Sequence, residues 1–183
     1  MIEDLAMHLA DLVQNSLRAG ARHIVVRLAL QEGLLQIVVS DDGAGIPQHD
    51  LAQVMDPFFT TKERARIGLG LPLLAQTAEE TGGRCSVTPR HGGGTEVRAQ
   101  FRWDHPDRPP LGDVVETLVP LLATSPRVEF TVELSDDRVT WLLSTREIRE
   151  RLGDVPLHHP EVLCFLANTL REGMDAAGLK EAR

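Results

Sequence analysis

The chain has 183 residues, a formal net charge of −8, two cysteines and no tyrosine. With 42% hydrophobic and 25% charged residues it has a globular composition, which excludes a disordered, collagen-like or disulfide-rich protein. The cysteines lack metal-binding or redox spacing, and the acidic N-terminus, without a basic flank or long apolar run, excludes a signal peptide and a membrane span. We therefore expect a cytoplasmic protein with reduced thiols.

The first hundred residues predict helices alternating with two β-hairpins. Leu5, Leu9, Val13 and Leu17 recur at helical spacing, and Gly20 follows them where a helix commonly ends. Alternating apolar residues separated by turn sequences predict the hairpins. The expected elements are a helix from about residue 3 to 19, strands at 23–30 and 34–40, a short helix near 49–54, a helix at 68–80, and strands at 84–89 and 95–103.

The composition changes after residue 103. Three prolines within seven residues mark 104–110 as a linker. We therefore expect one domain over 1–103 and a small α+β domain over 111–183. Residues 1–103 carry 10 basic and 12 acidic side chains, and the rest carry 9 and 15, so neither part is typical of nucleic-acid binders. The expected later elements are a helix at 111–123, strands at 127–134 and 138–144, and helices at 144–152 and 160–177.

Four clusters in the first part carry polar or glycine residues that regular structure does not require. Asp11 and Asn15 lie four apart on a predicted helix, so both project from one face, which indicates either a metal-binding pair or a solvated polar face. The second cluster, Asp41 with Gly43 and Gly45, follows a predicted strand. Its glycines either let the backbone approach a flat ligand or only provide the geometry of a tight loop.

The other two clusters contain residues that suit phosphate. Thr61 and Lys62 follow a Phe-Phe pair in an irregular segment. Gly68, Leu69 and Gly70 open a predicted helix, whose free N–H groups suit phosphate oxygens. The spacing of a Walker P-loop is absent, and a GxG alone is a weak signal.

In this order the clusters resemble the GHKL superfamily of DNA gyrase, heat-shock chaperones, histidine kinases and MutL-type repair proteins. The matching segments are DLVQNSLRAGA (the N box), SDDGAGI, DPFFTTK, GLGLPLL and GGGTEVRAQF, which cover about residues 1–103. The resemblance implies a two-layer α/β (α+β) sandwich of the Bergerat type, with a mixed or antiparallel sheet, that binds ATP and Mg²⁺.

The resemblance also implies roles for individual residues. Asn15 would coordinate magnesium, and Asp41 would accept a hydrogen bond from the adenine amino group. The remaining expected contacts are Gly43 and Gly45 with the purine, Thr61, Lys62, Gly68, Leu69 and Gly70 with the phosphates, and Thr95 beside Asp41 near the base.

Asp11 stands where gyrase-like ATPases and the related serine kinases have Glu and histidine kinases commonly have Asn. It is the candidate catalytic residue, either as a general base for an oxygen nucleophile or as a group that orders a magnesium-bound water. His8 lies one turn earlier and either orients Asp11 or is a partly buried helix residue. The reaction expected is ATP hydrolysis or phosphate transfer to a protein; the alternatives are a non-catalytic nucleotide-sensing switch, an anti-sigma-type serine kinase and a DNA-repair ATPase.

The sequence begins at the N box, so we expect a stand-alone protein without a phosphoacceptor domain that acts on a separate protein partner. The stretch TREIRERLGDVPLHHPEVLCFL resembles the C-terminal part of small ATP-binding proteins that accompany bacterial iron hydrogenase and NADH-oxidising subunits. This implies a regulatory role in a redox complex and a partner-docking second domain. A homodimer is left open, and neither membrane nor nucleic acid is expected as a partner.

Overall fold

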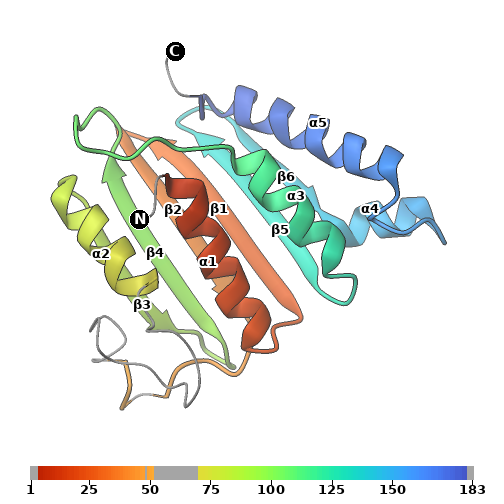
Figure 1. The fold of residues 1–183 in the computed structure, drawn as a ribbon, viewed down its shortest axis with the longest axis horizontal. Coiled ribbons are helices and arrows are strands. Elements are labelled where there is room, and N and C mark those ends of the chain that lie inside the picture. The colour runs from red at the N-terminus through yellow and green to blue at the C-terminus, as the bar shows by residue number, and fades with distance from the viewer. Residues whose placement is uncertain (1–3, 48, 52–69, 181–183) are drawn as a thin grey trace.

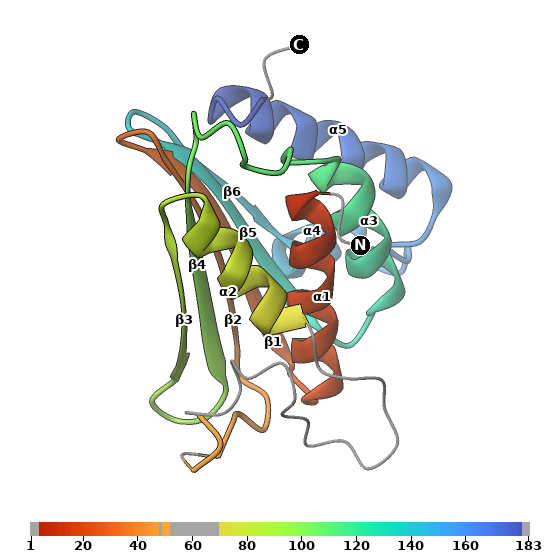
Figure 2. The ribbon, with the colours of Figure 1, turned by 60° about the vertical axis from the view of Figure 1, so that its left-hand side comes forward.

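The computed structural model describes residues 4–47, 49–51 and 70–180. Within these residues the strands form one sheet, and helices cover one of its faces (Figures 1 and 2). The elements are α1 (Leu5–Arg18), β1 (His23–Gln31), β2 (Leu34–Asp41), α2 (Gly70–Glu80), β3 (Arg84–Pro89), β4 (Thr95–Arg102), α3 (Val114–Thr124), β5 (Glu129–Asp136), β6 (Thr140–Ser144), α4 (Thr145–Leu152) and α5 (Pro160–Ala176).

The sheet has six strands in the order β3-β4-β2-β1-β5-β6. Neighbouring strands are antiparallel except for β1 and β5, which are parallel. Helices α1, α2, α3 and α5 all lie on one face of this sheet, as Figure 2 shows. The result is the α+β architecture with a mixed sheet that the motifs imply.

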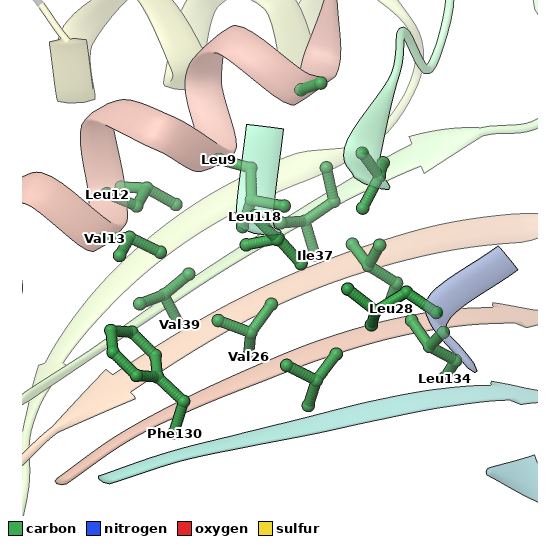
Figure 3. Close-up of a cluster of buried hydrophobic side chains, with 14 of the residues drawn as sticks. Leu9, Leu12, Val13, Val26, Leu28, Ile37, Val39, Leu118, Phe130 and Leu134 are labelled. Carbon is green, nitrogen blue, oxygen red and sulfur yellow. The ribbon is translucent and has the colours of Figure 1, made fainter. Parts of the chain in front are cut away.

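The core lies between the helices and the sheet. Strand β1 alternates buried and half-buried residues, so Ile24, Val26 and Leu28 face the helices while the residues between them face outward. Figure 3 shows side chains from α1, α3, β1, β2 and β5 meeting in this layer. One hydrophobic cluster includes residues from both sides of the 104–110 segment, so the two parts of the chain share a core.

The segment after residue 103 extends the same sheet and also supports α1. Strands β5 and β6 continue the sheet beyond β1, and the backbone N–H groups of Leu5 and Ala6 donate to the carbonyls of Pro110 and Leu111, at 2.9 Å each. These are N–H groups that a helix start leaves without partners in its own turns. The predicted division into two domains stays a prediction, and any such division has to accommodate the shared sheet and core.

Most of the predicted elements are confirmed with small shifts at their ends. The predicted antiparallel hairpins have the expected pairings, and Ser144 caps α4 by accepting from the Glu147 N–H at 3.4 Å. Of the predicted helix at 49–54, residues 49–51 form a turn and the rest lie outside the described residues, as do residues 68 and 69. Both cysteines are free thiols. Among the described helices, none is long and apolar enough to cross a membrane.

Candidate functional site

Asp41 lies at the C-terminal end of β2, buried on the face of the sheet that the helices cover. Its Oδ2 accepts a hydrogen bond from the Ser16 hydroxyl at 2.7 Å, and its Oδ1 accepts one from the Gly43 N–H at 2.9 Å. An ionised carboxylate has about four lone-pair sites. Two of them have no donor among the described residues, and the two protein donors fix the orientation of the carboxylate.

Glycine is required at two positions around this carboxylate. A Cβ at Gly43 would lie 2.8 Å from the Ala19 carbonyl oxygen, while a Cβ at Gly94 would lie 1.9 Å from that of Asp41. Gly94 also has a φ of +92°, which side chains rarely adopt. Gly45 packs against Gly94, since a Cβ there would lie 3.2 Å from the Gly94 carbonyl oxygen. The loops after β2 and before β4 thus meet backbone to backbone.

Thr95 and Arg90 bring the β3–β4 hairpin to Asp41. Glu96 pairs with Ser40, so Thr95, which is buried, stands on the neighbouring strand beside Asp41. The Arg90 guanidinium donates to the Asp41 carbonyl oxygen at 2.9 Å. The structure therefore brings four of the predicted site residues close together: Asp41, Gly43, Gly45 and Thr95.

Asp11 and Asn15 lie one turn apart on α1, with exposed side chains. Asn15 Oδ1 accepts a 3.3 Å hydrogen bond from Arg18. A Cβ at Gly70, the first residue of α2, would lie 3.4 Å from Asp11 Oδ2. The carboxylate of Asp11 is therefore close to the start of a second helix, where backbone N–H groups lack partners in the helix itself.

His8 is buried beneath this surface of α1. Burial lowers its pKa, although the carboxylates of Asp11 and Asp4 act in the opposite direction. Its Nδ1 is buried without a hydrogen-bond partner among the described residues. The ring is therefore a buried helix residue near Asp11, and no hydrogen bond to the Asp11 carboxylate is found there.

Four of the predicted site residues lie outside the described residues: Thr61, Lys62, Gly68 and Leu69. Three residues that the sequence did not single out contact the site or support it. Ser16 and Arg90 hold Asp41 as described above, and Asp42 Oδ1 accepts from the backbone N–H groups of Arg22 and His23 at 2.7 and 2.9 Å. Two of the three could have been singled out from the sequence, because Asp42 directly follows Asp41 and Ser16 directly follows Asn15.

A family model described as "Histidine kinase-, DNA gyrase B-, and HSP90-like ATPase" matches residues 2–105. The chain belongs to this family, and the match confirms the GHKL resemblance of the motifs. Sensor histidine kinase GtrS of Pseudomonas aeruginosa is 36% identical over 92 residues, which are 49% of this chain and 19% of that protein.

Similarity to MutL-type proteins extends further along the chain. The DNA mismatch repair protein MutL of Thermus aquaticus is 33% identical over 182 residues, 94% of this chain and 32% of MutL. The solved N-terminal domain of a DNA repair protein has a TM-score of 0.61 at 19% identity, covering 78% of this chain and 53% of that one, which shows a shared fold. The chain thus spans a third or less of the length of these two curated relatives.

Proposed function

We propose that the chain binds ATP with its adenine at Asp41. The observation that carries this proposal is the oriented, buried carboxylate of Asp41, which keeps acceptor capacity while Ser16 and Gly43 fix its position. Adenine offers an exocyclic amino donor, which a lone pair of this carboxylate can accept. ATP binding is a property that the family description also supports.

The residues of α1 fit a magnesium ion held together with the phosphates. Magnesium prefers oxygen ligands and is commonly bound by one or two side chains plus phosphate oxygens. Asn15, whose side chain is exposed, would supply its amide oxygen, which among the described residues accepts only a 3.3 Å hydrogen bond from Arg18. When bound, Mg²⁺ would neutralise charge on the phosphates. Gly70 would present the start of α2 to them, with Thr61, Lys62, Gly68 and Leu69 as further proposed contacts.

We propose that the bound ATP is hydrolysed or that its terminal phosphate is transferred to a protein partner. Asp11 is the proposed catalytic residue, because its carboxylate is exposed on the same face as Asn15 and lies close to the start of α2. It would accept the proton of an attacking water or hydroxyl. A regulatory role, with a redox complex as the partner, rests on the sequence resemblance alone.

The test combines binding and turnover. Titration calorimetry with ATP should show magnesium-dependent binding by the wild type, at least tenfold weaker binding by Asp41→Asn, and unchanged binding by Asp154→Asn, an exposed aspartate remote from the site. Equal affinity of the Asp41 and Asp154 variants would contradict the adenine assignment.

With γ-labelled ATP, free phosphate indicates an ATPase, label on a co-purified protein indicates a kinase, and bound nucleotide without either product indicates a sensing switch. Asp11→Asn should abolish turnover while retaining binding. Full turnover by this variant would contradict the proposed role of Asp11.

A second candidate function is that of a DNA-repair ATPase. The observation that favours it is that similarity to MutL covers 94% of this chain, whereas similarity to GtrS covers 49%. The net charge of −8 opposes direct contact with DNA phosphates. Fluorescence anisotropy with a labelled DNA duplex, with and without ATP, distinguishes this function from the one proposed above. Salt-sensitive binding to the duplex supports the repair function, and an anisotropy that stays constant contradicts it.

A further inference from the structure

The tip of the β3–β4 hairpin consists of residues 90–94, with the sequence Arg-His-Gly-Gly-Gly. The three glycines have positive φ angles of 92°, 110° and 92°. Two backbone hydrogen bonds cross the tip, from the Arg90 N–H to the Gly94 carbonyl at 3.1 Å and from the Gly93 N–H to the Arg90 carbonyl at 3.2 Å. Because glycine has more backbone freedom than any other residue, such a tip needs an anchor outside the hairpin to keep one position.

The side chain of Arg90 provides this anchor. Its guanidinium donates a 2.9 Å hydrogen bond to the carbonyl oxygen of Asp41, at the end of β2. A hydrogen bond from an ionised donor is stronger than one between neutral groups. The tip can offer only two side chains, those of Arg90 and His91, and within the described part of the chain only that of Arg90 bonds to β2.

Asp41 is therefore held at three of its atoms by three segments of the chain. Ser16 donates to Oδ2, the Gly43 N–H donates to Oδ1, and Arg90 donates to the main-chain oxygen. The first two contacts fix the carboxylate relative to α1 and to the loop after β2. The third fixes the same residue relative to the hairpin, in which the buried Thr95 directly follows the tip.

We propose that Arg90 is a positioning residue for the base, and that selection of a 6-aminopurine over a 6-oxopurine depends on it. This inference rests on the proposed binding of adenine at Asp41. A 6-aminopurine offers a donor to the carboxylate, whereas a 6-oxopurine presents an oxygen that can only accept. The difference is felt only when base and carboxylate stand in hydrogen-bonding geometry. Loss of the Arg90 anchor should therefore reduce the discrimination between the two purines, and not the affinity alone.

Titration calorimetry with ATP and with inosine triphosphate, both with Mg²⁺, measures this discrimination as a ratio of dissociation constants. The wild type should bind ATP about tenfold more tightly or better. Arg90→Met removes the donor but keeps the length of the side chain, and it should lower the ratio about threefold or more. Arg90→Lys can donate to the same carbonyl and should restore most of the ratio. Arg84→Met is the matched control, because Arg84 lies at the other end of β3, where it donates to Gln100 at 2.8 Å, and should keep the wild-type ratio.

The ratio separates positioning from stability, because partial unfolding weakens the binding of both nucleotides by the same factor. Arg90 is exposed, so its replacement should leave the core intact, and Arg90→Ala repeats the test if circular dichroism shows that methionine disturbs the fold. A folded Arg90→Met or Arg90→Ala variant that keeps the wild-type ratio, while Asp41→Asn abolishes the preference, would overturn this inference and leave the proposed function intact. A wild type that binds no ATP, or binds both nucleotides equally, would contradict the adenine assignment and this inference with it.

Discussion

The hydroxyl of Ser16 donates a 2.7 Å hydrogen bond to Oδ2 of Asp41, from the last turn of α1 to the end of β2. Both residues are buried, so the bond is shielded from water. It links the helix that carries Asp11 and Asn15 to the carboxylate proposed to bind adenine. The two halves of the proposed nucleotide site are therefore joined through one side-chain contact.

Removal of this hydroxyl should weaken both the fold and the site. Hydrogen bonds to charged groups contribute about 1.5–3 kcal/mol, so Ser16→Ala should lower the free energy of unfolding by about 2 kcal/mol. We also expect ATP to bind several-fold more weakly, because Asp41 would lose part of its orientation. Urea denaturation and calorimetry measure the two effects. Ser135→Ala, at a buried serine of β5, is the control, and an equal loss in both variants would contradict a specific role for Ser16.

Alanine substitutions at Gly92 and Gly94 form a matched pair that tests whether the β3–β4 hairpin packs on Asp41. Gly92 and Gly94 both have a φ of +92°, but a Cβ at Gly92 would have no atom within 4 Å, while one at Gly94 would lie 1.9 Å from the Asp41 carbonyl oxygen. Gly92→Ala should therefore lose only the conformational term of about 1–2 kcal/mol. Gly94→Ala should lose more than about 4 kcal/mol, or fail to fold, as measured by denaturation. Similar losses in the two variants would show that the hairpin does not pack on Asp41.

Asp42 should make stability depend on acid pH. The hydrogen bond from the His23 N–H is the main cause that lowers the pKa of its carboxyl, with that from Arg22 adding to it. Because the folded pKa is depressed, its contribution is fully present above the ordinary value near 4 and is lost as the pH falls through the lowered pKa. In urea melts Asp42→Ala should be about 1 kcal/mol less stable than the wild type at neutral pH, a difference that vanishes in strong acid. A difference that persists there would contradict the assignment to the charged form.

His8 should produce a second pH effect, nearer neutrality. Burial lowers its pKa in the fold, so between that value and about 6.5 the unfolded chain binds more protons and stability rises with pH. The slope is at most about 1.4 kcal/mol per pH unit for one group. His8→Leu should flatten the slope in urea denaturation between pH 5 and 7. An unchanged slope would show that His8 does not titrate differently in the two states.

The local elements could be predicted from the sequence because alternation and helical spacing are local properties. The sheet order could not, since the pairing of β1 with β5 joins segments far apart in the chain, with other elements between them. For the same reason residues 111–183 are predicted as a separate domain, although β5 extends the first sheet. Asp41 and Thr95 could be named from their motifs, whereas the contacts of Ser16 and Arg90 with Asp41 depend on tertiary packing.

The parallel pairing of β1 with β5 also has a consequence for synthesis on the ribosome. Strand β1 emerges early and can form its hairpin with β2 at once, but its other edge has no partner until the chain beyond Glu129 has emerged. Nascent chains shorter than this therefore expose an apolar strand edge, which is prone to aggregation. A fragment that ends near residue 105 would keep this exposed edge, even though it spans the whole segment that the family model matches.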